Sequence, residues 1–278
     1  MHITRIRAAF GSMQLSAVRP SHVRTWTPQL AAEGLSESYV YALHARLSQL
    51  YTDAVHDGIV ARSPVSRRTS PGAGKPRPYV ATTDQVWALH DAMPEHLRPA
   101  ILLGAFVGLR AAEACGLRVV DVDFMRGVVS PEVQYPAEPL KTETSRTPVP
   151  IPHSLSLTLS AHVARWRAET VLVNEMGERL GPWMLERAVR SARRKVPGLP
   201  PRFRYHDLRH YFASLLIASG DDVKVVRARL RHASAKTTLD TYGHLWPDSD
   251  DSTRAAVDVV LAARAGKDNL RTVEGEGT

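Results

Sequence analysis

Apolar residues recur at helical spacing over most of this chain. Between Ser36 and Gly58 they return every three or four positions, which predicts a helix that begins after a serine cap and ends at a glycine. A shorter helix is expected within residues 20–34, where Pro28 would bend it because proline lacks a backbone donor. Together these helices predict a small helical domain over residues 1–65.

The pattern breaks over residues 66–80. Helical spacing gives way there to prolines, glycines and basic residues, a composition typical of a linker, and the positive charge favours contact with phosphates. Helical spacing returns at Thr83, the expected N-cap of the next helix. A second domain is therefore predicted over residues 81–247, followed by a C-terminal helix and an acidic tail over 248–278.

A change of period inside the second domain predicts a small sheet. Residues 119–151 contain short β-type runs separated by turns, at 119–124, 127–135 and 146–152. Helices are expected around 101–107, 155–166, 183–195, 206–219, 222–230, 235–241 and 250–265. The predicted fold class is therefore mainly α with a small antiparallel β-sheet.

The charge of the chain indicates what kind of partner it binds. The 278 residues carry a net charge of +8, and 30 of the 36 basic residues are arginine. Residues 1–80 carry a net charge of +6, whereas residues 248–278 carry −3. A high arginine content can reflect a GC-rich genome. Arginine is also suited to bidentate hydrogen bonding with phosphate oxygens. A basic body with an acidic tail favours a nucleic-acid partner.

Several protein classes are disfavoured by what the sequence lacks. A single cysteine, Cys115, excludes a disulfide framework and a cysteine-rich zinc site, and there is no HExxH motif. No apolar run approaches the ~20 residues of a membrane span. The N-terminus has no signal-peptide pattern. We therefore expect a soluble, cytoplasmic protein, while its twelve histidines leave a His/Asp metal site conceivable.

Four short motifs contain the candidate chemistry. HDLRHYFAS places His206 and Arg209 three residues apart, on one face of a helix. GLRAAEACGLR places Arg110 at a helix start, and PLKTETSRTPVP places Lys141 on a hairpin between strand-like runs. Each also has an ordinary interpretation: a capping histidine, an Arg110–Glu113 ion pair and a solvated lysine.

The fourth motif, LRHASAKTTLDTY, places His232 ten residues before Tyr242. A phenol with an ordinary pKa near ~10 is a poor nucleophile unless its surroundings change that. Gly243 follows and would let the backbone turn and free the side chain. His244 is expected to pack or cap rather than to react.

The order of these motifs resembles the tyrosine recombinase (phage integrase) family, whose site has two arginines, a lysine, two histidines and a tyrosine. The resemblance covers about residues 15–265 and is strongest over 100–247; TTLDTYGHLWPD looks like integrases of actinobacterial phages and mobile elements. Residues 15–75 resemble the family's helical core-binding domain, but the chain starts inside that region. The chain therefore looks N-terminally short, with an incomplete first domain.

The resemblance implies a two-domain DNA clamp with the tyrosine recombinase catalytic fold. It also implies six catalytic residues: Arg110, Lys141, His206, Arg209, His232 and Tyr242. The arginines would clamp the scissile phosphate, Tyr242 would attack phosphorus, and Lys141 would protonate the leaving 5′ oxygen. His206 would act as an acid/base partner, and His232 would donate a hydrogen bond to the phosphate. The intermediate is a 3′-phosphotyrosyl bond, and no ATP, metal or other cofactor is implied.

The implied partner is double-stranded DNA. The family resemblance implies a homotetramer on paired DNA sites, a monomer when free, and accessory directionality factors. Residues 249–266 form the expected exchange element between protomers, although packing on their own domain fits the pattern nearly as well. Arg231 stands where the family usually has glycine, and would either contact DNA or strain the turn that presents His232.

The sequence thus predicts a site-specific DNA recombinase that mediates integration or excision. A type IB topoisomerase shares this chemistry but only relaxes supercoils. A truncated, catalytically impaired integrase would bind DNA without cutting it. A helix-turn-helix regulator using residues 222–241 would leave Arg110, Lys141 and Tyr242 without a role.

Overall fold

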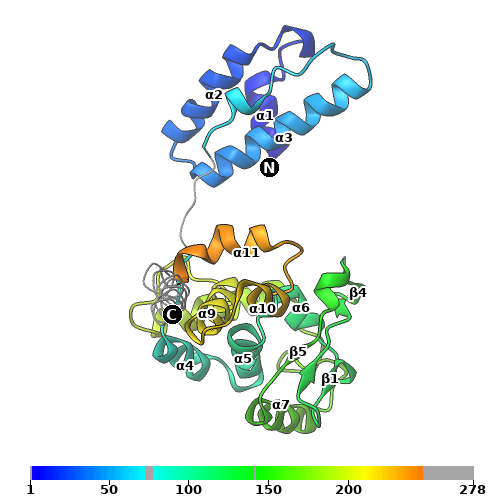
Figure 1. The fold of residues 1–278 in the computed structure, drawn as a ribbon, viewed down its shortest axis with the longest axis vertical. Helices are drawn as coiled ribbons and strands as arrows, with labels where there is room; N and C mark the ends of the chain where they lie inside the picture. The colour runs from blue at the N-terminus through cyan, green and yellow to red at the C-terminus, as the bar shows by residue number, and fades with distance from the viewer. Residues whose placement is uncertain (1, 73–77, 141, 247–278) are drawn as a thin grey trace, which may run out of the picture. The chain divides into compact units, whose positions relative to one another are not determined.

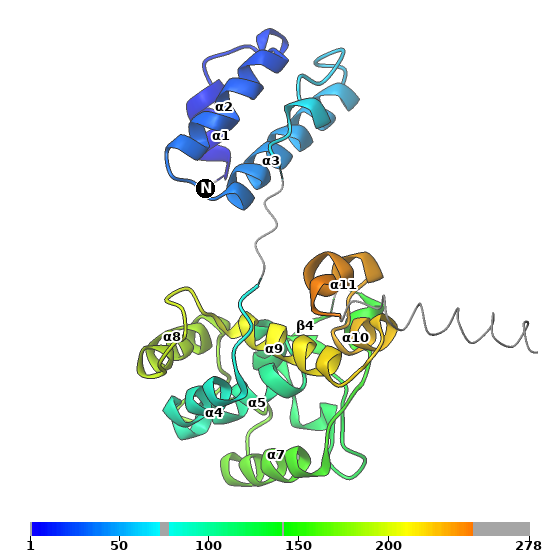
Figure 2. The same ribbon diagram turned by 60° about the vertical axis from the view of Figure 1, so that its left-hand side comes forward.

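The computed structural model describes residues 2–72, 78–140 and 142–246. The chain divides into two compact units, one ending at Arg77 and the other beginning at Pro78. Both are drawn in Figures 1 and 2. Each unit has its own hydrophobic core.

Three α-helices make up the described part of the first unit: α1 (His2–Phe10), α2 (Pro20–Ala32) and α3 (Glu37–His56), with 3-10 turns η1 (Leu15–Ala17) and η2 (Arg67–Thr69). The predicted cap of α3 is confirmed, because the Ser36 hydroxyl accepts a hydrogen bond from the Tyr39 N–H. The helix ends before Gly58, whose φ is +71°. Helix α2 continues through Pro28 to its end at Ala32.

Helix α1 was not predicted. Its apolar pattern is weak, since Ile6 is its one buried side chain within the described residues. Packing against α3 stabilises it instead, and tertiary contacts of this kind are not visible in a nine-residue window. The first unit therefore holds one more helix than its sequence pattern predicts.

Part of the predicted linker is folded onto the first unit. Residues 66–69 include the turn η2, where the Thr69 hydroxyl lies 3.0 Å from His44 Nε2, and both side chains are buried. Burial lowers the pKa of His44, so the ring is neutral at pH 7. This contact fixes the path of the chain as it leaves the three-helix unit.

The second unit is mainly helical. Its α-helices are α4 (Thr83–Ala92), α5 (Arg98–Phe106), α6 (Ala111–Gly116), α7 (His153–Trp166), α8 (Pro182–Ala192), α9 (Tyr205–Ala218), α10 (Val223–Arg229) and α11 (Ala235–Tyr242). Its 3-10 turns are η3 (Glu95–Leu97), η4 (Val119–Asp121), η5 (Glu143–Arg146), η6 (Arg193–Lys195) and η7 (Gly243–Leu245). The N-cap of α4 is Thr82 rather than the expected Thr83, because Gln85 completes a capping box with Thr82.

Helix α5 lies at the centre of this unit and packs against α4, α7 and α9 (Figure 2). It is apolar on all sides, which is the pattern of a buried helix. Gly104 lets α9 approach closely, since a Cβ there would lie 2.9 Å from Leu208 Cδ1 and 3.1 Å from Tyr205 Cζ. The first turns of α9, which contain the HxxR motif, are therefore held against the core.

The predicted antiparallel sheet is present but its strands are short. Strands β1 (Val122–Asp123), β2 (Val128–Val129) and β5 (Val149–Pro150) form one sheet in the order β1-β2-β5, and β3 (Val133–Gln134) pairs with β4 (Glu138–Pro139). Val129 pairs with Val122 on one side and Val149 on the other. Pro131 separates β2 from β3 where a single strand was expected, because proline cannot donate to a ladder.

The fold class is therefore the predicted one: mainly α with small antiparallel sheets. The helix expected over residues 250–265 lies outside the described residues. Among the helices that the structure describes, none has the length and apolar character needed to cross a membrane.

Candidate active site

Candidate residues from four elements meet at one side of the second unit. Arg110 precedes α6, His206 and Arg209 lie in the first turns of α9, His232 follows α10, and Tyr242 ends α11. Helix α11 packs against α10, and η7, which directly follows α11, packs against α9 (Figure 1). Lys141, the sixth predicted residue, lies outside the described residues.

Arg209 is the buried centre of the site. Its side chain donates to the carbonyls of Gly108, before α6, and Leu230, after α10, and the residue is 1% exposed. Burial, followed by the charges of Arg110 and Arg231, lowers its pKa to about 9, so the guanidinium is still protonated at pH 7. A cation fixed in this way is pre-organised to receive negative charge.

Arg110 forms the ion pair with Glu113 that its spacing predicts. Its Nη1 lies 2.7 Å from Glu113 Oε1, and its backbone N–H donates to Oε2 at 2.9 Å. Glu113 is buried, but the Arg110 side chain remains 40% exposed. The ion pair therefore orients Arg110 without hiding it from a ligand.

Arg231, the residue in the usual glycine position, is also buried. Its Nη2 lies 2.5 Å from Glu113 Oε2, and the side chain is fully shielded from solvent, so it does not provide an exposed DNA contact. Its backbone has φ +53°, in the left-handed region that favours glycine. The second alternative left by the sequence, a strained turn before His232, is the one found.

Three histidines surround the arginines, and the pKa of each is lowered. Burial, then the charges of Arg209 and Arg110, lower the pKa of His232 to about 3, and the same causes lower the pKa of His206. Burial, then neighbouring His206 and Arg209, lower the pKa of His210 to about 4. All three rings are therefore neutral at pH 7. A bound phosphate would raise these pKa values, because negative charge favours the imidazolium.

Tyr242 is held between two of these histidines. Its hydroxyl lies 2.7 Å from His210 Nδ1, and its ring stacks on His232 with centroids 6.5 Å apart. His232 is fixed in turn by Thr238, whose hydroxyl lies 2.9 Å from its Nδ1. Burial raises the pKa of Tyr242 to about 12, although the charge of Arg209 opposes this shift. The hydroxyl is therefore protonated in the free protein.

His210 is the site residue that the sequence prediction missed. It lies four residues after His206 on the same face of α9, and that spacing was the available signal. Its Nε2 lies 3.9 Å from Asp207 Oδ1, which favours a proton on Nε2 and leaves Nδ1 to accept from Tyr242. Asp207, His210 and Tyr242 thus form a carboxylate–imidazole–phenol series.

Two other tyrosines lie on α9, Tyr205 and Tyr211, and neither makes a hydrogen bond or a ring contact with the site histidines in the described structure. Tyr205 is fully buried against α5, and its hydroxyl has no hydrogen-bond partner among the described residues. The Tyr211 hydroxyl lies 3.1 Å from that of Thr83 on α4. The geometry therefore favours Tyr242 as the nucleophile. Within the described residues, no cluster of three or more histidine, cysteine or acidic side chains could hold a metal ion.

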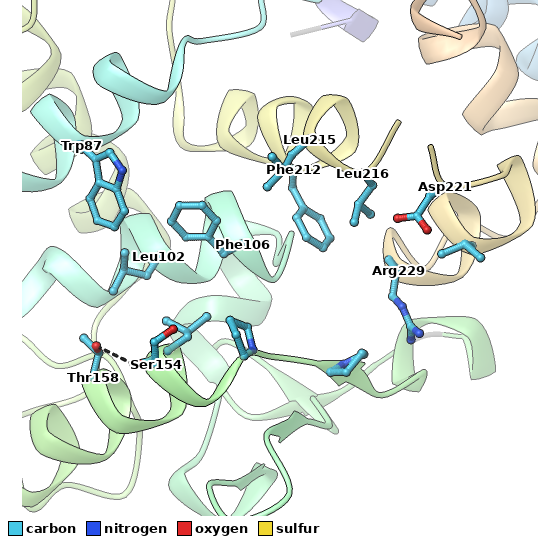
Figure 3. Close-up of a pocket in the computed structure, with 14 residues that line it drawn as sticks. Trp87, Leu102, Phe106, Ser154, Thr158, Phe212, Leu215, Leu216, Asp221 and Arg229 are labelled. Carbon is cyan, nitrogen blue, oxygen red and sulfur yellow. Dashed lines mark hydrogen bonds between the residues drawn. The ribbon is translucent and has the colours of Figure 1, made fainter. Parts of the chain in front are cut away.

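A separate apolar groove of about 630 Å³ runs between α9 and the helices α4, α5 and α7. Phe212 and Leu216 reach into it from α9, opposite Phe106 and Trp87 (Figure 3). Asp221 lies at its other end and accepts a hydrogen bond at 3.2 Å from the indole of Trp246, the last described residue. The chain therefore leaves the described structure at the rim of this groove.

Comparisons with known proteins agree with this geometry. Residues 80–248 match the phage integrase family. A tyrosine recombinase XerC-like protein of Caldanaerobacter subterraneus subsp. tengcongensis is 24% identical over 273 residues, covering 84% of this chain and 69% of that protein. The ICEBs1 integrase of Bacillus subtilis is 24% identical over 286 residues, covering 91% and 74%.

Solved structures show the same fold. The Tn1549 transposon integrase bound to transposon right-end DNA superposes with a TM-score of 0.76 at 18% identity, covering 93% of this chain and 90% of that one. A lambda integrase dimer bound to a core site gives 0.69 at 21% identity, covering 85% and 86%.

Proposed function

Because this chain belongs to the phage integrase family, we infer that it is a site-specific DNA recombinase of the tyrosine type. The environment of the Tyr242 hydroxyl is the observation that best supports catalysis. Its hydroxyl lies 2.7 Å from a neutral histidine, beside the buried Arg209, whose hydrogen bonds go to two backbone carbonyls rather than to an acidic side chain. A merely DNA-binding relic would not require that arrangement.

The proposed reaction is a transfer of the phosphodiester from DNA to protein. Arg110 and Arg209 bind the nonbridging oxygens of the scissile phosphate, where negative charge builds up. The oxygen of Tyr242 attacks phosphorus, its O–P bond forms, and the bond from phosphorus to the 5′ oxygen breaks. Lys141 is proposed to protonate that oxygen. His206 and His232 are proposed to donate hydrogen bonds to the phosphate.

The proton of Tyr242 also needs an acceptor, and His210 is the proposed one. Its Nδ1 already accepts the hydroxyl hydrogen bond, so the proton can pass along it as the O–P bond forms. Asp207, near Nε2, would stabilise the resulting imidazolium. The negative charge of the bound phosphate would also stabilise the protonated His210.

Replacing His210 with glutamine should slow formation of the covalent protein–DNA complex by roughly 10²-fold or more, because an amide is not a base. The measurement is a single-turnover rate on a nicked duplex that contains the target site, identified from the repeats flanking the gene. His244→Gln, at an exposed histidine two residues past Tyr242, is the matched control. A wild-type rate for His210→Gln would show that the proton goes elsewhere.

Covalent-complex formation should continue in excess EDTA. Arg110 and Arg209 would supply the charge neutralisation that a divalent cation supplies in metal-dependent nucleases. The assay compares adduct yield with EDTA and with added magnesium. Cleavage that is lost in EDTA and restored by magnesium would point to a nuclease-type mechanism and would overturn this proposal.

The first unit is proposed to be the core-binding half of a DNA clamp. It carries the strongest positive charge in the chain, and its helices present basic side chains such as Arg7, Arg24 and Arg46 at exposed positions. Charge of this kind binds phosphates with little sequence information. The catalytic unit is proposed to bind the scissile phosphate of the same duplex.

A tetramer on paired DNA sites is the proposed assembly. Solved relatives include a lambda integrase dimer on a core site and a tetramer on a Holliday junction. In this chain, residues 249–266 follow Trp246 at the rim of the apolar groove, and their apolar residues Val257, Val260 and Leu261 suit its lining. We propose that this segment docks in the groove of a neighbouring protomer.

Truncation after Trp246 should abolish pairing of two DNA sites while leaving binding to one site intact. The segment lost carries a net charge of −3, so its removal should not weaken the overall attraction of the chain to phosphates. Gel shift measures single-site binding, and a two-site bridging assay measures pairing. Leu261→Asp should behave like the truncation, whereas Ser252→Asp, which adds the same charge at a polar position, should not. Pairing that survives truncation would place the segment on its own domain.

A further inference from the structure

Arg231 occupies a backbone position that normally selects glycine. It follows α10 with φ +53°, and its N–H donates to the Ala228 carbonyl at 3.0 Å. The next N–H, that of His232, donates to the Arg227 carbonyl at 3.1 Å, which completes a helix-ending turn. A side chain in this left-handed conformation costs steric strain that glycine avoids. Some favourable interaction must offset that strain.

The side chain of Arg231 adds a second cost, because its charge is removed from water. The guanidinium is fully shielded, and its Nε and Nη1 have no hydrogen-bond partner among the described residues. Among the described side chains, its Nη2 donates to Glu113 at 2.5 Å. A buried cation is tolerated only when it is paired, so the contact with Glu113 is what holds this arginine in place.

Glu113 connects Arg231 to the candidate active site. One carboxylate oxygen receives Arg231, and the other receives Arg110 Nη1 at 2.7 Å. The oxygen shared with Arg231 also accepts the Arg110 backbone N–H at 2.9 Å. Arg231 and Glu113 are 118 residues apart in the chain, so this contact ties the turn before His232 to the start of α6.

We propose that Arg231 is a positioning residue for strand cleavage: it fixes the Glu113 carboxylate, which aims the Arg110 fork at the scissile phosphate. This inference rests on the proposed function. Arg231 also takes part of the carboxylate's charge, so Glu113 neutralises Arg110 less completely. The three arginines and one glutamate then present a net positive site to DNA.

The pKa of Glu113 gives a measurable test of this proposal, because an Arg231 that only stabilised the fold would not change the pH dependence of cleavage. Burial alone would raise the pKa of Glu113, but Arg231, Arg110 and the hydrogen bonds from Arg110 lower it overall. The other groups that face it are Arg209, His206 and the phenol of Tyr205. Removing Arg231 takes away the largest opposing charge, so the pKa of Glu113 should rise.

The experiment measures the single-turnover rate of covalent-complex formation between about pH 5 and 9 for Arg231→Met, Arg231→Lys and Arg231→Gly. Arg231→Met should cleave roughly 10- to 100-fold more slowly than wild type, with DNA affinity nearly unchanged. The rate of Arg231→Met relative to wild type should fall further as the pH falls through the raised pKa of Glu113, because a protonated carboxyl no longer holds Arg110. Arg231→Lys keeps the charge and should recover much of the rate.

Arg231→Gly separates strain from positioning. Arg231→Gly should melt at a higher temperature than Arg231→Met, because glycine relieves the backbone strain at φ +53°. It should nevertheless cleave as slowly as Arg231→Met. In a Glu113→Gln background, Arg231→Met should cost little further rate, because the two residues act through one contact. Melting temperatures of all variants identify any that fail to fold.

Three results would overturn the inference. The first is a wild-type cleavage rate for Arg231→Gly. The second is a reduction of the cleavage rate in Arg231→Met that is the same at every pH. The third is a double variant, Glu113→Gln with Arg231→Met, in which the rate reductions of the two single variants multiply. The wild-type protein is the internal control for the underlying function. If it forms no adduct, the proposed function fails; if it does and the Arg231 variants match it, only the positioning role fails.

Discussion

Replacing Arg209 with lysine should reduce covalent-complex formation by roughly 10²- to 10³-fold or more. The guanidinium donates to two carbonyls from different segments, Gly108 and Leu230, while facing the site. A lysine ammonium is a point charge without a planar fork, so it cannot keep both contacts and offer two donors to a phosphate. The rate is measured on the nicked duplex at saturating protein.

DNA affinity distinguishes a catalytic arginine from a general phosphate contact. Arg209→Lys should bind the target duplex nearly as well as wild type, because the buried residue offers little surface to ground-state DNA. Arg165→Ala, at an exposed arginine of α7, is the matched control and should leave the cleavage rate unchanged. Equal losses of binding and cleavage in Arg209→Lys would demote it to a binding role. A melting curve checks that the variant folds.

Replacing Tyr242 with phenylalanine should abolish adduct formation altogether. The ring still stacks on His232, so packing is kept, and only the hydroxyl and its bond to His210 are lost. That bond is worth about 1 kcal/mol of stability, too little to unfold the domain. The variant should therefore bind the same DNA with wild-type affinity.

Tyr211→Phe is the control for this substitution. It also removes one hydroxyl, the one that lies 3.1 Å from Thr83, but in a contact between α9 and α4. It should still form the adduct. Residual covalent complex in Tyr242→Phe would mean that the nucleophile has been assigned to the wrong residue.

Helices with strong local signals were predictable from the sequence. Helix α3 has both a capping serine, Ser36, and a terminating glycine, Gly58, and its bounds agree with the prediction to within two residues at each end. Helix α1 has neither signal and depends on contacts with α3. The split between β2 and β3 was predictable from Pro131, but the run of valines on either side obscured it.

The candidate site was predictable where motif order carried information. Arg110, His206, Arg209, His232 and Tyr242 come from separated segments, yet the structure brings them within electrostatic or direct contact of one another. Their catalytic roles stay a prediction, and Lys141 lies outside the described residues.

Two features of the site required coordinates. His210 shares a helix face with His206, but only the fold brings the hydroxyl of Tyr242 to it. Arg231 was recognisable as an unusual residue at a turn, whereas its partner, Glu113, lies 118 residues away in the chain. Long-range pairs of this kind leave no periodic signal in a single sequence.

The most direct test of the central claim is to identify the residue that becomes joined to DNA. Wild-type protein is trapped on a nicked suicide duplex, the complex is digested with protease, and the DNA-linked peptide is sequenced by mass spectrometry. The account predicts a 3′-phosphate bonded to Tyr242 in the peptide that spans α11. DNA bonded to Tyr205 or Tyr211, or cleavage with no covalent intermediate, would contradict it.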